Sequence, residues 1–362
     1  MKALPLLMRV LRDPVGMASL NLPEWDLLLR QATAANLTVS LFYMAEERGL
    51  LAQIPVQPRQ HLLWARALGE RHRQAVCFEV AKVGAALADA GVPLILLKGA
   101  AYLIAGLPPG AGRLFSDIDI LVPKARLAEV EGVLILHGWA GTHLDAYDQR
   151  YYRQWMHELP PMQHMHRQSM LDVHHAILPE TAAVRPDPDK LRAAARTIPG
   201  MPGVQILAPA DMVLHSAVHL FYDGEFDKGL RDLVDLHRLL QHFGALPGFW
   251  DMLPDRAYEL QLARPLFYAL RYASLFLGTV VPESALNALE RARPPRLLLA
   301  AMDRLFGRAL LPMHASCADS LTPAAHFLLY VRGNWLRMPP GLLVRHLFHK
   351  ALLSKSPSYT PA

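Results

Sequence analysis

Apolar residues recur at intervals of three and four positions along the first quarter of the chain, and this spacing predicts helices. Asn21 followed by Pro23 is typical of a helix start, because asparagine caps the first turn and proline is tolerated there. The pattern continues over residues 38–49. A long helix is predicted over 59–90, and Gly91 is suited to end it.

The pattern changes after this helix. Residues 92–97 form an apolar run typical of a strand buried on both faces, and a Lys-Gly turn then leads into a short helix over 100–105. After a loop rich in glycine and proline, residues 117–122 alternate between acidic and apolar side chains. Successive side chains of a strand point to opposite faces, so Asp117 and Asp119 share one face and the isoleucines between and after them point to the core.

The next segment predicts a helix over 125–136 and then a region of strands and turns. Within it, residues 162–166 and 170–174 alternate in the manner of a β-hairpin. On the second arm, Asp172 and His174 share a face, whereas their apolar neighbours take the other. An aspartate flanked by leucine and valine needs a partner, which makes Asp172 a candidate for a polar site.

Beyond the hairpin we predict a short helix over 191–197, a small strand over 204–207, and helices to the end of the chain. The expected fold class is α+β, with a mixed β-sheet core between N-terminal helices and a C-terminal helical domain. The corresponding division is 1–91 for the N-terminal helices, 92–207 for the sheet core and 208–362 for the C-terminal domain.

Composition narrows the class of protein. The chain has 362 residues, of which 52% are hydrophobic and 19% charged, so it is a globular protein with a sizeable core. Two distant cysteines are typical of thiols in a reducing compartment. No apolar run approaches the roughly 18 residues that span a bilayer, and the N-terminus lacks a secretory signal, so we expect a cytoplasmic protein. A net charge of +5 fits nucleotide binding but argues against nucleic acid as a partner.

The aspartate pair is the first candidate for chemistry. Asp117 and Asp119 would repel each other on one strand face unless a cation lies between them, and carboxylate oxygens suit Mg²⁺. A solvated turn is the alternative, since Ser-Asp motifs are common at loop ends. The Lys98-Gly99 turn and Arg113 favour a phosphate site, because a helix N-terminus and a guanidinium both bind phosphate.

The stretch LLKGAAYLIAG…GRLFSDIDILV resembles the signature of the DNA polymerase β-like nucleotidyltransferase superfamily. Within it, the chain is similar to uncharacterised bacterial nucleotidyltransferase families with a Lys-Gly turn, an arginine and a Ser-Asp-x-Asp motif. The usual Gly-Ser or Gly-Gly turn is here Lys98-Gly99-Ala100, so the hydroxyl that often contacts phosphate is missing. The resemblance covers about a third of the chain and does not identify the acceptor.

The resemblance implies a Mg²⁺-dependent transfer of a nucleoside monophosphate from a nucleoside triphosphate, with ATP expected, to a small-molecule or protein acceptor. Two Mg²⁺ ions would be held by three carboxylates. The implied catalytic and metal-binding residues are Asp117, Asp119 and Asp172, the last matching an aspartate–apolar–histidine strand of these families. The implied nucleotide-binding residues are Lys98, Gly99, Arg113, Ser116 and His174.

Several alternatives stay open at this point. Lys98 and Arg113 could instead be structural, with Arg113 bracing an aspartate, and Ser116 could cap its turn. Histidines on the predicted strands could hold a transition metal, although no metal-binding helical motif accompanies them; they are His157, His164, His166, His174 and His175. His215, His219 and the Arg-Asp-x-x-Asp run from Arg231 could form helix-to-helix salt bridges or contact the substrate.

Two further functions fit the same sequence. The protein could be a non-catalytic nucleotide sensor or an antitoxin-like binding protein of the same fold. It could also be a peripheral membrane protein, because residues 332–350 are basic and amphipathic. A terminal helix docked on the core is the alternative for that segment, and the tail from Ser354 is expected to be disordered.

Overall fold

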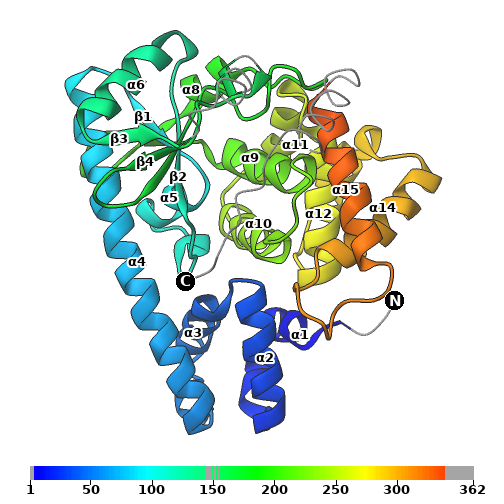
Figure 1. The fold of residues 1–362 in the computed structure, drawn as a ribbon. Helices are drawn as coiled ribbons and strands as arrows, with labels where there is room; N and C mark the ends of the chain where they lie inside the picture. Colours follow the sequence, from blue (N-terminus) through cyan, green and yellow to red (C-terminus); the bar gives the residue numbers. More distant parts are fainter. Residues whose placement is uncertain (1–3, 143–148, 150–151, 154, 339–362) are drawn as a thin grey trace.

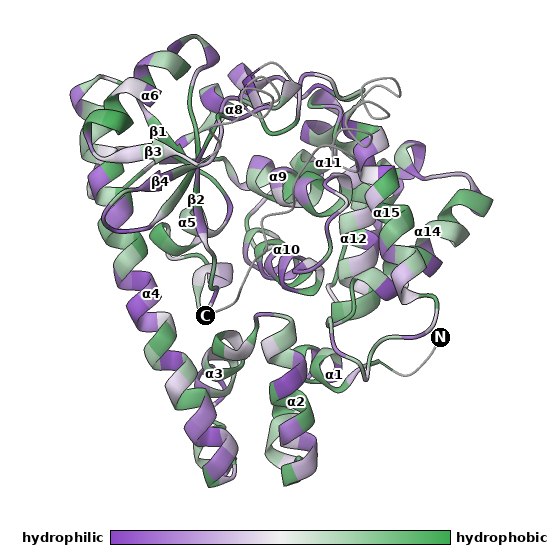
Figure 2. Cartoon of the chain, in the orientation of Figure 1, coloured by the Kyte–Doolittle hydropathy of each residue, from purple (hydrophilic) through white to green (hydrophobic). Residues whose placement is uncertain are grey.

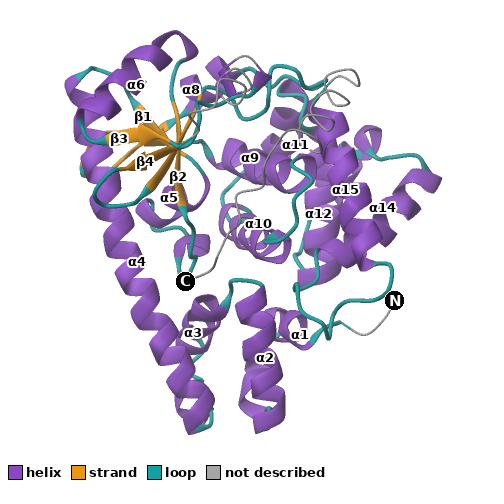
Figure 3. Ribbon diagram, in the orientation of Figure 1, coloured by secondary structure: helices purple, strands orange, loops and turns teal. Residues whose placement is uncertain are grey.

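The computed structural model describes residues 4–142, 149, 152–153 and 155–338. Within these residues, seven strands form one mixed sheet in the order β3-β4-β5-β2-β1-β7-β6. Figure 3 shows the strands, in orange, gathered in one part of the molecule. The strands are β1 (Leu94–Leu96), β2 (Asp117–Leu121), β3 (Trp139–Gly141), β4 (Met162–His164), β5 (Met170–His174), β6 (Arg196–Ile198) and β7 (Met201–Ile206).

The centre of the sheet combines parallel and antiparallel pairs. β2 runs antiparallel to β1 and parallel to β5, and β1 runs parallel to β7. The predicted hairpin is present as β4 and β5, with a left-handed turn residue at Gln168. The strand order therefore places β2 directly beside β5, although about fifty residues separate them in the sequence.

The N-terminal helices form as predicted. Asn21 and Glu24 make a reciprocal capping box, in which each side chain accepts a hydrogen bond from the other residue's backbone N–H at 3.0 Å. The long helix packs against β1, β7 and two helices of the sheet region, and its first half extends away from the sheet (Figure 1). These elements are α1 (Leu6–Arg12), η1 (Pro14–Ser19), α2 (Leu22–Ala34), α3 (Thr38–Glu47), η2 (Leu51–Gln53) and α4 (Val56–Asp89).

The helices of the sheet region connect its strands. They are α5 (Lys98–Ile104), η3 (Pro108–Gly110), η4 (Lys124–Arg126), α6 (Leu127–Leu136) and α8 (Pro188–Ala194). The prediction of a helix over 191–197 is wrong at its end, because residues 196–198 form β6 and pair with β7. The alanine-rich run that precedes β6 favours a helix locally, and pairing with a neighbouring strand overrides that preference.

A group of helices follows β7. They are α9 (Pro209–Tyr222), α10 (Gly229–Phe243), α11 (Phe249–Glu259), α12 (Ala263–Leu277), α13 (Glu283–Ala288), η5 (Glu290–Ala292), α14 (Arg296–Ala309) and α15 (Thr322–Arg337). α9 and α10 lie on the side nearest the sheet, and α14 and α15 lie farthest from it (Figure 1). α9 also contacts α5, which joins the helical region to the sheet.

The described part of the basic C-terminal segment is docked on this helical group. Arg332 donates a hydrogen bond to the Phe221 carbonyl at 2.7 Å and lies over three aromatic rings, and Arg337 pairs with Asp223. These contacts favour a docked terminal helix over a membrane-binding one for residues 332–338. Residues 339–350 and the tail lie outside the described residues.

One hydrophobic cluster runs from the N-terminal helices through the sheet to α14 and α15. Figure 2 shows polar and apolar residues alternating along the helices that surround the sheet, with α4 mixed along its whole length. The fold class is confirmed: a mixed sheet lies between N-terminal and C-terminal helices. The division at residues 91 and 207 stays a prediction. Among the described helices, none is both long enough and apolar enough to span a membrane.

Candidate active site

Two carboxylates lie on the same face of β2. Ile118 and Ile120 are buried in the core, so the strand's alternation turns Asp117 and Asp119 to the opposite face. Asp119 is itself buried, with 6% of its surface exposed. A buried carboxylate requires a cation or hydrogen-bond donors around it.

A third carboxylate comes from the neighbouring strand. β2 and β5 pair in parallel, and the register sets Asp119 directly beside Asp172. As a result, one carboxylate oxygen from each of Asp117, Asp119 and Asp172 lies within 4.8 Å of the other two. The structure thus brings together the three acids that the sequence singled out.

The three acids could hold a divalent cation. Burial, followed by the charges of Asp119 and Glu158, raises the pKa of Asp172 from 3.8 to about 7. Like charges at this distance destabilise each other, and a divalent cation would relieve that repulsion. The donor set consists of oxygens alone, which suits Mg²⁺ better than a transition metal.

Two cationic or polar side chains meet Asp119 at one oxygen. Lys98 Nζ lies 3.1 Å from Asp119 Oδ1, and His174 Nε2 lies 3.0 Å from the same atom. Burial opposes ionisation of Asp119, but Lys98 and then His174 hold its pKa well below the usual range. Asp119 is therefore ionised, and no hydrogen bond or ion pair from a described residue engages its second oxygen, which can face a cation.

His174 links the site to a residue that the sequence analysis did not identify. Its Nδ1 lies 3.2 Å from Glu158 Oε2, so the ring bridges Asp119 and Glu158. Burial lowers the pKa of His174, but Glu158 and Asp119 outweigh burial and raise it. The sequence carried no signal for Glu158, which reaches β5 through a single β-bridge to His174.

The Lys98-Gly99 turn has an unusual backbone. Lys98 has a φ of 42°, in the left-handed region that side chains other than glycine seldom adopt. Such strain concentrates at functional sites. At Gly99, a Cβ would lie 2.0 Å from Arg113 Nη1 and 2.8 Å from the Phe115 ring. Gly99 therefore makes room for Arg113 and Phe115.

Arg113 braces two aspartates of the helical region. Its Nε donates to Asp235 Oδ2, and its Nη2 lies 3.5 Å from Asp232 Oδ1. The guanidinium also lies over the Tyr102 and Phe115 rings, and 7% of the residue is exposed. Of the two interpretations left open for Arg113, this geometry favours the structural brace.

Ser116 is close to the aspartates but weakly held. Its hydroxyl lies 3.4 Å from Asp117 Oδ1 and the pair is exposed. Among the described residues, no backbone N–H donates a hydrogen bond to the Ser116 oxygen, so the side chain does not cap the turn. Ser116 is therefore free to turn toward a ligand.

A cavity of about 320 Å³ opens between β2 and the helical region. Its lining combines residues of the strand, the turn at Lys98 and the segment that joins α9 to α10. The lining residues are Lys98, Arg113, Phe115, Asp117, Asp119, His219, Asp223, Glu225, Asp227, Lys228, Arg231 and Asp232. Both signs of charge meet here, so the cavity can receive a phosphate chain together with its cation.

The far wall is held by salt bridges within the helical region. Arg231 pairs with Asp232 at 2.6 Å, and His219 Nδ1 lies 3.9 Å from the other Asp232 oxygen. The pair of Arg231 and Asp232 lies within α10, and His219 is the one contact here that comes from α9. Burial lowers the pKa of His219, so this contact is not a helix-to-helix salt bridge of the kind that the simpler interpretation expected. Arg231 and His219 nevertheless line the cavity.

The strand histidines do not share one site. His164 accepts hydrogen bonds at Nδ1 from two backbone N–H groups of the hairpin turn, those of His166 and Arg167. His157, Glu158 and His174 have ligand atoms within 4.8 Å of one another, but both nitrogens of His174 already face carboxylates. The histidines therefore support the carboxylates and the turn, and a dedicated transition-metal site is not favoured.

Residues 21–278 match the model of a protein family described as an uncharacterised nucleotidyltransferase. The chain belongs to this family. The match extends from α2 to the residue after α12, so it includes the sheet, the three carboxylates and the cavity wall. No curated protein and no solved structure matches the chain. For this nucleotidyltransferase family member, the acidic cluster on β2 and β5 is the part that could bind a metal.

Proposed function

We propose that the protein transfers a nucleoside monophosphate from a nucleoside triphosphate to an acceptor and releases pyrophosphate. The observation that carries this proposal is the cluster of Asp117, Asp119 and Asp172 beside a cavity with cationic side chains. Family membership supports the reaction class. We propose Mg²⁺ as the cofactor, as two ions, and ATP as the expected nucleotide.

In this proposal each residue has a defined task. Asp117, Asp119 and Asp172 would hold the Mg²⁺ ions, which would neutralise charge on the phosphates and on the leaving pyrophosphate. Lys98 keeps Asp119 ionised, and His174 fixes its orientation through the contact with Glu158. Gly99 and Arg113 shape the turn, and Ser116 is available to donate a hydrogen bond to a phosphate oxygen.

The chemistry is a substitution at the α-phosphorus. An acceptor oxygen forms a bond to this phosphorus as the bond to the β-phosphate oxygen breaks, so pyrophosphate leaves with that bonding electron pair. Asp172 accepts the acceptor's proton, because its carboxylate lies beside the two acids of β2 where the acceptor would meet the nucleotide. Positioning of the reactants by the strand face supplies the rest of the rate enhancement.

The cavity wall supports a small-molecule or protein acceptor. Asp223, Glu225 and Asp227 line it opposite the aspartates of β2. A nucleic-acid backbone carries a dense negative charge, which these carboxylates would repel. We therefore infer an acceptor that is neutral or cationic, with a hydroxyl group to receive the nucleotide.

The test is incubation of the protein with ATP, GTP, CTP or UTP labelled at the α-phosphate, Mg²⁺ and a metabolite and protein extract. We expect label in an acceptor and one pyrophosphate released for each transfer, and loss of both in Asp119→Ala. Nucleotide binding without release in every extract would instead indicate the non-catalytic sensor.

A further inference from the structure

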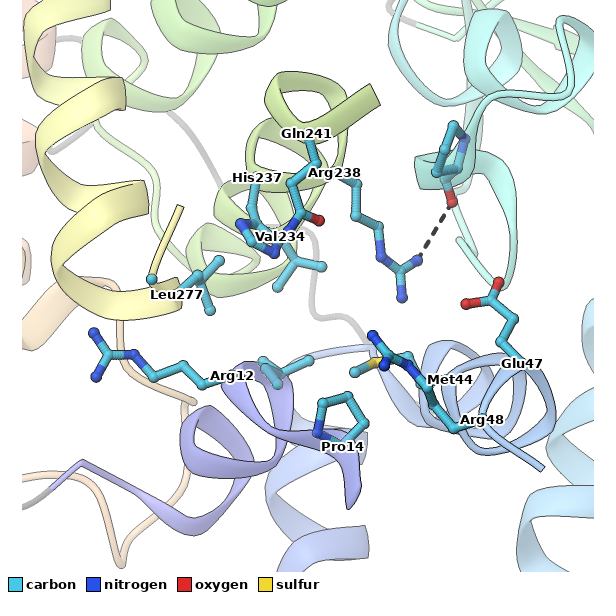
Figure 4. A pocket seen from close by; sticks show the side chains of 13 residues that line it. Arg12, Pro14, Met44, Glu47, Arg48, Val234, His237, Arg238, Gln241 and Leu277 are labelled. Carbon is cyan, nitrogen blue, oxygen red and sulfur yellow. Dashed lines mark hydrogen bonds between the residues drawn. The ribbon is translucent and has the colours of Figure 1, made fainter. Parts of the chain in front are cut away.

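A second cavity lies between the N-terminal helices and α10, and none of the three aspartates lines it. It measures about 250 Å³, and its basic side chains are Arg12, Arg48, His237 and Arg238 (Figure 4). Glu47 is its one acidic lining residue. None of these residues lines the cavity at the aspartates, so this is a separate site.

Two of the arginines turn their guanidinium groups toward each other across the cavity. Figure 4 shows Arg48 rising from α3 and Arg238 descending from α10, with Glu47 to one side. No ion pair within 4 Å joins Glu47 to either arginine in the described part of the chain. The cavity therefore holds cationic groups that Glu47 does not neutralise at contact distance.

Of Arg48 and Arg238, Arg238 has the charge that costs more free energy to bury. Its Nη1 donates to the carbonyls of Ala111 at 3.2 Å and Pro108 at 3.4 Å. Burial lowers its pKa, against the opposing effect of Asp235 and Glu47. Asp235 is already engaged by Arg113, so the direct partners of Arg238 among the described residues are carbonyl groups and no carboxylate.

The other two basic groups are partly occupied. Arg12 donates to the carbonyls of Phe276 at 2.9 Å and Leu275 at 2.6 Å, at the C-terminus of α12. His237 Nδ1 lies 2.7 Å from the Thr279 hydroxyl. In contrast, the exposed guanidinium of Arg48 has no side-chain hydrogen bond or ion pair to any described residue, so its donors are available to a ligand.

We propose that this cavity binds a phosphate group, as inorganic phosphate or as a small phosphomonoester. Converging guanidinium groups present paired N–H donors that match phosphate oxygens. The volume is below the range of about 300–1,000 Å³ that is usual for larger ligands, which favours a small anion. The ligand would supply the counter-charge that Arg48 and Arg238 lack.

The proposed phosphate site is connected through α10 to the residues that hold Arg113. Arg238 lies one helical turn after Asp235, which holds Arg113, and the carbonyls that Arg238 contacts belong to the loop before Arg113. A phosphate bound to Arg238 would therefore act on the element that positions Arg113. The binding itself, however, does not depend on the proposed nucleotidyl transfer.

Calorimetric titration of the full chain tests the proposal, first with inorganic phosphate and then with glycerol phosphate in a chloride buffer. We expect saturable binding that weakens with salt, and a loss of about tenfold or more in Arg48→Gln, because each charge-assisted hydrogen bond is strong. Arg238→Gln should show a similar loss. Arg296→Gln, at an exposed arginine that does not line the cavity, is the matched control and should titrate like the original protein.

The result with the two probes identifies the source: a preference for the ester indicates a phosphorylated metabolite, and equal binding indicates phosphate itself. Equal affinity in Arg48→Gln and Arg296→Gln would overturn the proposal. So would loss of phosphate binding in Lys98→Gln with full binding in Arg48→Gln, which would place the phosphate in the cavity at the aspartates. Absence of saturable heat up to about 10 mM of either probe would also reject it.

Discussion

Asp119 and Asp172 occupy paired positions on two parallel strands, so their carboxylates emerge side by side from the same face of the sheet. This pairing joins residues from β2 and β5 that are far apart in the sequence. A one-residue shift in register would turn Asp172 into the core and leave Asp117 and Asp119 without a third oxygen donor. The proposed chemistry therefore depends on the register in which β2 pairs with β5.

Removal of one carboxylate should abolish transfer. We expect Asp119→Asn and Asp172→Asn each to lower the rate of pyrophosphate release by about a thousandfold, equivalent to about 4 kcal/mol, because charge stabilisation by the metal site would be lost. The measurement is transfer of the α-phosphate label to the acceptor, with pyrophosphate release assayed in parallel. Asp255→Asn, at an exposed aspartate of α11, is the control and should keep full activity. An active Asp172→Asn protein would remove Asp172 from the mechanism.

Asp172 should also lower the free energy of unfolding in metal-free protein. Its pKa is about 7 in the folded state and 3.8 as the ordinary value. Between these values the folded state binds more protons, so the stability contributed by the protonated form falls as pH rises and is lost above pH 7. In buffer with a chelator, Asp172→Asn should therefore raise the free energy of unfolding at pH 8 by about 2–4 kcal/mol, and by much less near pH 4.

Urea unfolding of both proteins at the two pH values measures this difference. Addition of Mg²⁺ should stabilise the original protein by mass action and leave Asp172→Asn nearly unchanged. A gain that is the same at pH 4 and pH 8 would show that titration of Asp172 is not its cause.

Gly99 should not accept a side chain. The Cβ of Gly99→Ala would overlap Arg113 and Phe115, and Arg113 cannot withdraw without leaving its aspartates, so we expect a loss of about 1–3 kcal/mol in unfolding free energy. Gly132→Ala is the matched control. Gly132 lies exposed in α6 with open space at its Cβ, so alanine there should stabilise the helix by about 0.5–1 kcal/mol. Equal effects in both variants would contradict the packing argument.

The buried ion pair of Arg113 and Asp235 can be tested by a double-mutant cycle. Removal of either partner leaves a buried charge, so Arg113→Met and Asp235→Leu should each cost about 3–5 kcal/mol. The double variant should cost less than the sum of the two. Arg293 and Glu290, an exposed pair on the surface, provide the comparison and should show a coupling of about 0.5 kcal/mol or less. Additive losses at Arg113 and Asp235 would mean that their contact does not stabilise the protein.

Much of the fold could be predicted from local pattern. The capping residue Asn21, the long helix that ends just before Gly91 and the alternation around Asp119 are each specified by neighbouring residues. β6 could not be recognised, because the preceding alanines favour a helix and the strand exists through its pairing with β7. Local sequence therefore indicated most of the elements, whereas tertiary pairing decided that residues 196–198 form a strand and not the end of a helix.

The candidate site shows the same limit. The alternation of Asp117, Asp119 and Asp172 predicted the shared face, but the sequence could not choose between a phosphate-binding and a structural Arg113. That choice depends on Asp235, which is 122 residues away. Glu158 was missed for a similar reason, since its contact with His174 depends on tertiary pairing of Glu158 with the end of β5.

The contact between Arg113 and Asp235, 122 residues apart, also has a consequence for the order in which the protein folds during synthesis. During synthesis, Arg113 emerges well before α10, and its guanidinium has no aspartate partner from that helix until the ribosome has passed residue 235. A nascent chain that stops short of α10 would have to keep this cation in water, which leaves the turn at Gly99 unfilled. The cavity beside Asp117 and Asp119 is thus completed late in translation, and a fragment that ends after β7 would contain the three aspartates without the helix that holds Arg113.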